Sequence, residues 1–388
     1  MRYNIFDGFR GFFLLFMGII HLNVELDTII GKLNHHYFGW VEDAQGFVFI
    51  SGFVVGLVYG GAYLKKGRPA MFRKIYGRVR TIYSHQIGLI LILLATAFFL
   101  SLFSIVPRAL TPYINEPVFF TLASTMLVAA SYNMGILPMY IYFMVITPFA
   151  LVIIKRGYTG VIAIICILLW MLAQTGLIDE VTSWGERVSV AMGHPIEFGI
   201  FFDIFGWQIL FFSGLYSGFK LAEGKLDLQF LKQPVYTIIF LIGLLGFFLL
   251  GVFDRVIFDF WISNEFSETF LQMTSRNEFS VIYVVAFYLD LFLVTWILVA
   301  GRTCGISTIE KLGHLVNWIF TRRFLVFLGQ HSLHVFSYHI LLVYLVSIWR
   351  SEQPVPELMG SIILLLGAAS LYIPAWLHAR VQNRNKGR

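Results

Sequence analysis

The chain has 388 residues, of which 58% are hydrophobic and 13% are charged. Soluble globular proteins carry about 25% charged residues, so this composition excludes a soluble protein and indicates a polytopic membrane protein. The net charge of +6 is better explained by membrane topology than by nucleic-acid binding, and we expect no nucleic-acid partner. The cysteines, Cys166 and Cys304, fall in or beside apolar spans and predict no disulfide framework.

Apolar segments of about 20 residues are long enough to cross a bilayer as helices. The sequence contains ten of them, at residues 5–22, 46–64, 82–106, 135–154, 158–178, 200–219, 236–253, 281–301, 324–349 and 357–378. We therefore predict an all-α membrane protein with about ten transmembrane helices. No polar stretch reaches the roughly 50 residues of a separate soluble domain, so residues 1–388 are treated as a single domain.

The segments between these spans alternate in charge. Segment 65–80 carries seven Lys or Arg and no acid, whereas residues 23–45 carry four acids. The positive-inside rule makes the basic set cytoplasmic, which predicts both termini inside and His21 near the outer face. Segment 117–134 is apolar enough to span, but counting it would invert every later helix. It is therefore predicted to be a re-entrant or interfacial helix.

The first span contains Arg10 and His21, eleven residues apart on one helical face. Asp7 lies one turn before Arg10 and Glu25 one turn after His21. Ionisable groups at bilayer depth are expensive and indicate function. His21 suits a general base, Glu25 suits a partner that holds its tautomer, and Arg10 suits an anion or a structural pair with Asp7. The alternative is that these side chains only snorkel to the two interfaces.

The second span begins with Asp43 at its outer mouth and has a face of small residues at 51–61. Such a face favours close helix packing. The alternative is that it leaves a narrow channel for an extended ligand. Four residues in or just after the basic segment are candidates for binding the phosphates of a nucleotide-type cofactor: Arg73, Arg78, Arg80 and His85. The alternative is a topogenic segment that contacts anionic lipid headgroups.

Two later segments carry further candidates. In segment 327–345, His331, His334, Tyr338 and His339 follow helical spacing. Without a nearby Cys or carboxylate they predict no metal site, and Tyr338 and His339 are expected to line a pore or to bond between helices. In segment 201–214, Asp203, Trp207 and Gln208 combine groups that bind sugars. The same residues would equally suit an ordinary interfacial belt.

At these residues the sequence resembles a known family. The opening D-x-x-R-G-(x)9-H, which contains Arg10 and His21, resembles the signature of the transmembrane acyltransferase superfamily, acyltransferase type 3. Five further segments resemble its OpgC branch, the succinyltransferases of osmoregulated periplasmic glucans. These are DAQGFVFISGFVVGLVYG, the basic segment leading to RVRTIYSHQ, ILPMYIYFMVITPFAL, GWQILFFSGLYSG and FLGQHSLHVFSYHILLVYL.

The resemblance implies a multi-pass enzyme of the bacterial inner membrane, surrounded by lipid. Cytoplasmic acyl-CoA would be a donor substrate rather than a tightly bound cofactor, and a periplasmic glucan hydroxyl would be the acceptor. His21 would deprotonate that hydroxyl, and Arg10 would steady the donor or orient the site. From their own positions in the sequence, we expect five further residues to contact the acceptor: Asp43, Trp207, Gln208, Tyr338 and His339. Only the resemblance to the OpgC branch indicates succinyl as the transferred group, so acetyl remains an alternative. Two other functions remain as alternatives: an acetyltransferase of another envelope polysaccharide and a glycan transporter. The protein could also form a homo-oligomer.

Overall fold

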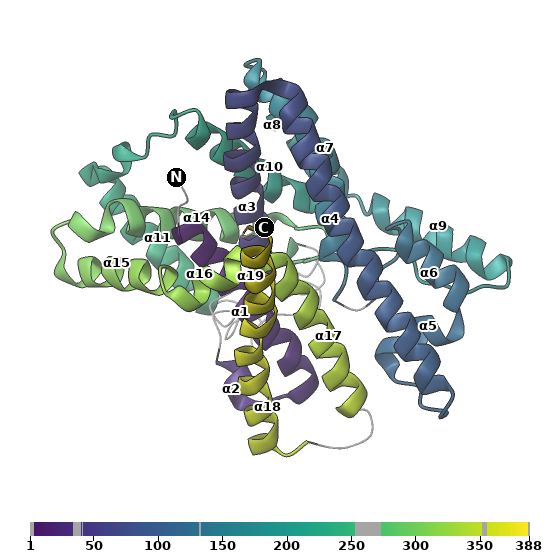
Figure 1. Ribbon diagram of the computed structural model, residues 1–388. Coiled ribbons are helices and arrows are strands. Elements are labelled where there is room, and N and C mark those ends of the chain that lie inside the picture. The colour runs from purple at the N-terminus through teal and green to yellow at the C-terminus, as the bar shows by residue number, and fades with distance from the viewer. Residues whose placement is uncertain are drawn as a thin grey trace.

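The computed structural model describes residues 4–33, 40, 42–131, 133–252, 273–350 and 355–386. These residues form helices, and their only β-type pairing is a bridge between Ala129 and Gly199. Within this part of the chain, seven helices are long and apolar enough to cross a membrane, or up to eight if a bent pair counts as one span. The chain is thus a multi-pass membrane protein (Figure 1), and its described residues contain fewer such helices than the ten predicted.

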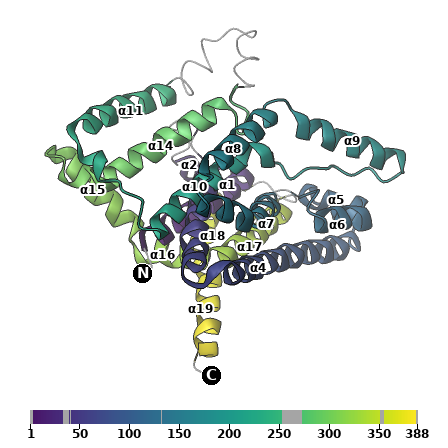
Figure 2. The ribbon, with the colours of Figure 1, turned by 90° about the horizontal axis from the view of Figure 1, so that it is seen from above.

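Of the seven candidate spans, three run through more than one helix. The seven are α1 (Asn4–Leu26), the run of α3 (Asp43–Val55), η2 (Gly56–Gly60) and α4 (Gly61–Ser101), then α7 (Ile136–Lys155), α11 (Pro234–Val252), α14 (Val281–Val299) with η6 (Gly301–Thr303), α17 (Ser332–Arg350), and α18 (Glu357–Ser370) with α19 (Tyr372–Lys386). Figure 2 shows α19 projecting from the rest of the molecule.

The largest difference from the predicted spans lies between residues 46 and 106. Two spans joined by a basic loop were expected; the structure has two helices that meet at a kink at Gly67, so helical residues run from Asp43 to Ser101 with no loop between them. Within α4 only Gly67 leaves helical geometry, with φ 77° and ψ 177°, a conformation that glycine adopts at little cost. The basic residues of 65–80 therefore lie in helices on either side of Gly67, and Lys and Arg are good helix formers.

Other predicted spans bend, shift or divide in the structure. Segment 158–178 forms α8 (Thr159–Ala173), which bends by 55° into α9 (Leu177–Ala191). Segment 200–219 forms α10 (Ile204–Ala222), and segment 324–349 divides into α16 (Arg323–Gln330) and α17. Within segment 117–134, α6 (Pro117–Thr125) has nine residues, too few to cross a bilayer.

Glycines bring two helix pairs into backbone contact. A Cβ on Gly52 or Gly56 would lie 2.1 Å from a backbone oxygen of α10, and a Cβ on Gly214 or Gly218 would lie 2.2 or 1.9 Å from one of α3. The two small-xxx-small faces thus pack against each other, which confirms close packing as the use of the glycines in the second span. Gly11 of α1 and Gly329 of α16 make the same kind of contact.

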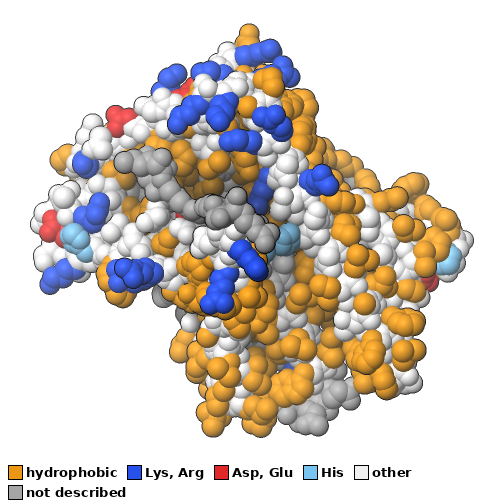
Figure 3. Space-filling view, viewed as in Figure 1, with side chains coloured by type: hydrophobic (Ala, Val, Ile, Leu, Met, Phe, Trp, Pro, Cys, Tyr) orange, Lys and Arg blue, Asp and Glu red, His pale blue; other side chains and the backbone are white. Residues whose placement is uncertain are grey.

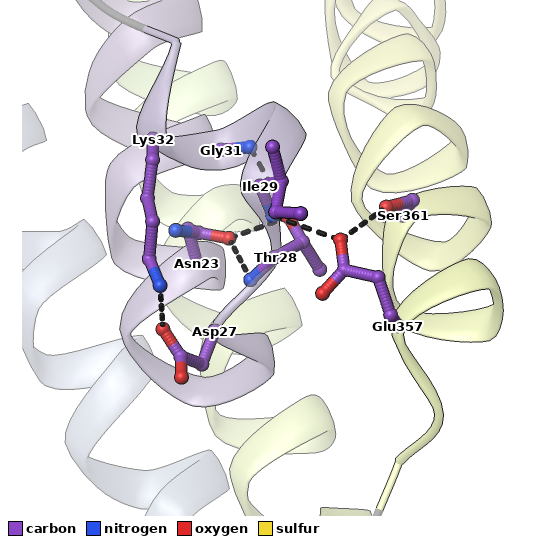
Figure 4. Close-up of polar contacts among 8 residues, drawn as sticks. All are labelled: Asn23, Asp27, Thr28, Ile29, Gly31, Lys32, Glu357 and Ser361. Atoms are coloured by element: carbon purple, nitrogen blue, oxygen red, sulfur yellow. Dashed lines mark hydrogen bonds and ion pairs between the residues drawn. The ribbon is translucent and has the colours of Figure 1, made fainter.

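Hydrogen bonds fix the C-terminal end of α1, just after His21 (Figure 4). Thr28 N and Oγ1 both donate to Asn23 Oδ1, at 2.8 and 2.7 Å. Ile29 N donates to Glu357 Oε1 of α18 at 2.8 Å, which ties the short helix α2 (Ile29–Lys32) to the C-terminal part of the chain. An ion pair with Lys32 at 2.8 Å lowers the pKa of the Asp27 carboxyl.

The surface separates into apolar and basic areas. Figure 3 shows Lys and Arg gathered at the top of this face, over the region where Figure 1 places the tops of α3, α4 and α8. Hydrophobic side chains cover much of the area below. Apolar surface of this extent on a soluble protein would aggregate, whereas lipid covers it in a membrane.

Candidate functional site

His21 lies on a cavity of about 1280 Å³. The cavity walls come from α1, α3, α17 and the segments around α5 (Thr111–Asn115), α6 and residues 197–202. Its charged lining consists of three arginines and four acids: Arg108, Arg276, Arg350, Glu25, Glu42, Asp43 and Glu197. A cavity of this size with both apolar and charged walls suits a sizeable polar ligand.

The imidazole of His21 contacts a second histidine. His21 Nδ1 lies 3.1 Å from His339 Nε2 of α17. His339 Nδ1 lies 2.7 Å from the carbonyl oxygen of Phe336, and the His339 side chain is buried. The hydrogen-bonding partner at His21 Nδ1 is thus His339. Glu25, which the sequence suggested for this role, faces the same cavity one helical turn away.

An ion pair at the cavity wall joins α3 to the segment before α14. Arg276 Nε lies 2.6 Å from Glu42 Oε2, and Tyr283 donates to Glu42 Oε1 at 3.2 Å. Asp43, the next residue, is buried and also lines the cavity. The predicted residue Asp43 is therefore in the same cavity as His21, together with a neighbouring ion pair that the sequence did not indicate.

Arg10 lies in a separate cluster at the other end of α1. Its guanidinium donates to Ser332 Oγ of α17, and its Nε has no hydrogen-bond partner among the described residues. Arg78 of α4, Tyr59 of η2 and Tyr140 of α7 lie within electrostatic reach. The positive charges of Arg10 and Arg78 repel each other, and the nearby carboxylate of Asp7 opposes that repulsion. Sequence analysis missed both tyrosines, since one tyrosine in an apolar run carries no distinctive signal.

Four histidines continue this cluster as a row of touching rings. His331 Nδ1 lies 2.8 Å from His378 Nδ1 of α19, and the His378 ring stacks on His334 with centroids 3.6 Å apart. His85 of α4 meets His334 edge-on at 4.8 Å and bonds to Ser337 Oγ at 2.8 Å. Arg78 is within electrostatic reach of three of these rings, so Arg78 and His85 of the predicted cofactor residues meet here.

The remaining candidates lie elsewhere. Arg73 and Arg80 are exposed on α4. Trp207 is fully buried and its Nε1 donates to the carbonyl of Arg276 at 3.0 Å. Gln208 Nε2 donates to the carbonyl of Cys166 at 2.7 Å, and Tyr338 donates to Ser370 Oγ at 3.1 Å. The structure thus uses these last three side chains for hydrogen bonds between separate segments of the chain.

Within the described ranges, no group of three or more His, Cys, Asp or Glu is arranged to hold a metal ion. This includes the row of histidines, in which one ring pair stacks and another meets edge-on.

Comparison with protein families gives one result for the whole chain. The family model described as OpgC protein matches residues 2–383. The chain belongs to the OpgC family. No curated protein and no solved structure matches it. Membership indicates a role in the modification of osmoregulated periplasmic glucans. In this OpgC protein the match includes both the His21 cavity and the Arg10 cluster.

Proposed function

We propose that this OpgC protein is a membrane O-acyltransferase that moves an acyl group, succinyl or acetyl, from cytoplasmic acyl-CoA to hydroxyls of periplasmic glucans. The observation that carries the proposal is the position of His21, hydrogen-bonded at Nδ1 and facing a large cavity with charged walls. A glucan is a large neutral polyol, and the carboxylates and arginines of this cavity offer many acceptors and donors for its hydroxyls.

In the proposed reaction the two polar sites hold the two substrates. The glucan occupies the His21 cavity, and His21 takes the proton of one hydroxyl as that oxygen attacks the thioester carbonyl. The carbon–sulfur bond then breaks, CoA leaves as a thiolate, and the proton passes from His21 to solvent or to the thiolate. The products are an acyl ester on the glucan and free CoA. The enzyme would sit in the bacterial inner membrane with both chain ends cytoplasmic.

The Arg10 cluster is suited to the donor. Arg10 and His21 are separated by about 16 Å along α1, so a donor held near Arg10 would need an extended arm to bring its thioester to His21. The pantetheine arm of CoA has this form. Arg78 and the Nε of Arg10, which has no hydrogen-bond partner among the described residues, would bind phosphate or carbonyl oxygens of the donor. Lipid headgroups outside the bundle would meet the exposed Arg73 and Arg80 instead.

Direct transfer is favoured over a covalent acyl-enzyme. Ser131 lies in the cavity, but its hydroxyl donates to Met134 Sδ at 3.1 Å and lies 3.5 Å from the Tyr113 hydroxyl. Neither neighbour is a base that would activate a serine.

Deleting the gene is expected to remove acyl groups from periplasmic glucans. Mass spectra of glucans from wild-type, deletion and complemented cells measure this, and the mass added per group identifies succinyl or acetyl. Acylated glucans in all strains, or in none, would contradict the proposal. A change in the amount of exported glucan with no acyl difference would favour a transporter.

Replacing Arg78 by alanine is expected to raise the KM for acyl-CoA about tenfold or more, because one charge-assisted phosphate contact is worth about 1.5–3 kcal/mol. The KM for glucan should stay unchanged. Steady-state kinetics of the purified protein check both values. Lys74, exposed one turn earlier on the same helix, provides the matched control Lys74→Ala. Equal effects of the two substitutions would remove Arg78 from the donor site.

A further inference from the structure

Two hydrogen bonds connect His21 to the backbone of α17 through one buried ring. The Phe336 carbonyl can only accept, so the 2.7 Å contact with His339 Nδ1 requires a proton on that nitrogen. The His339 side chain is 1% exposed, and a charge there would be costly to bury. A neutral ring with its proton on Nδ1 carries a lone pair on Nε2.

That lone pair determines the tautomer of His21. His339 Nε2 lies 3.1 Å from His21 Nδ1, so the bond forms only if His21 Nδ1 donates. His21 then carries its proton on Nδ1 and its lone pair on Nε2. If His339 were itself protonated, its Nε2 would donate instead, and His21 would hold its proton on the wrong nitrogen for a base at Nε2.

We propose that His339 is a positioning residue that keeps His21 in the Nδ1–H tautomer and accepts a hydrogen bond from the imidazolium formed during transfer. This inference rests on the proposed function. In serine hydrolases a carboxylate orients the histidine in this way; here a neutral imidazole does so, held by the Phe336 carbonyl. Glu25 lines the same cavity and is available to the acceptor hydroxyls.

The arrangement depends on α1 and α17 running in the same direction. Arg10 meets Ser332 at the start of α17 and His21 meets His339 two turns later. Neighbouring packing is tight, since Val335, Phe336 and Ile340 are all buried. The His339 ring therefore has little freedom to turn away from His21.

The test compares three variants of the purified full-length protein with acyl-CoA and glucan. His339→Leu is expected to lower kcat about 10- to 100-fold, a fraction of the full general-base contribution, with both KM values within about twofold of wild type. The acid limb of its kcat–pH profile should move to lower pH, because the protonated form of His21 has lost its acceptor. His339→Gln places an amide oxygen near the position of Nε2 and should restore kcat to within about tenfold and return the acid limb.

Ile340→Val is the packing control, since it removes one methylene on the same turn and leaves both histidines in place. Wild-type kcat and an unmoved pH profile in His339→Leu would overturn the positioning role. The positioning role would also be overturned if His339→Leu lowered kcat without moving the acid limb and His339→Gln did not restore kcat. That result would assign His339 a packing role. An inactive wild-type protein would instead contradict the proposed function.

Discussion

Replacing His21 by alanine is expected to lower the kcat of acyl transfer by about 10²–10⁴-fold, the usual contribution of a general base. Binding of acyl-CoA should persist, because Arg10 and Arg78 lie in the separate cluster at the other end of α1. Steady-state kinetics together with acyl-CoA binding to the purified protein measure both effects.

Two further variants separate loss of the base from damage to the fold. His21→Asn retains an N–H near the position of Nδ1 and can still donate to His339, but it cannot take a proton. It should be as inactive as His21→Ala and as stable as wild type. His314→Ala removes an exposed histidine from α15 (Ser307–Phe320) and should be fully active. Activity of His21→Asn within tenfold of wild type would show that His21 is not the base.

Replacing Gly218 by valine is expected to separate α10 from α3 and to destabilise the protein by about 3 kcal/mol. A Cβ at Gly218 would lie 1.9 Å from the Phe53 oxygen and 2.7 Å from its carbonyl carbon. Both are backbone atoms, so no side-chain rotation can relieve the clash. Thermal unfolding in detergent, followed by tryptophan fluorescence, measures the change.

Gly88 provides the matched control for this substitution. It lies inside α4, and a Cβ there meets nothing within 4 Å. Gly88→Val should therefore change the free energy of unfolding by less than about 1 kcal/mol. Equal unfolding temperatures for Gly218→Val and Gly88→Val would mean that the close approach of α3 and α10 does not contribute to stability.

Local patterns in the sequence predict much of this fold. The apolar segment 5–22 corresponds to α1, and the spacing of Arg10 and His21 predicts their shared face. The small residues of 51–61 predict close packing, because small side chains allow two helix backbones to approach closely. Hydropathy was wrong about the backbone of 65–80: its seven basic residues predicted a loop, whereas the segment is helical on both sides of a kink at Gly67.

Contacts between residues far apart in the chain could not be predicted from the sequence. His21 and His339 are 318 positions apart, and nothing local indicates that α17 runs beside α1. For the same reason the sequence suggested Glu25, a near neighbour on α1, as the partner of His21. The meeting of Arg10, Arg78, Tyr59 and Tyr140 likewise depends on four separate elements. Trp207 and Gln208 suited a sugar site by composition, but their polar atoms bond to backbone carbonyls inside the bundle.

The most direct test of the central claim uses the purified protein in liposomes, with isotope-labelled succinyl-CoA or acetyl-CoA on the side of the basic helix α4 and glucan on the side of the His21 cavity. Wild-type protein should transfer label to the glucan as an alkali-labile ester, whereas His21→Ala should leave the glucan unlabelled. Label transfer by His21→Ala at the wild-type rate, or glucan that stays unlabelled with wild-type protein and both donors, would contradict the account.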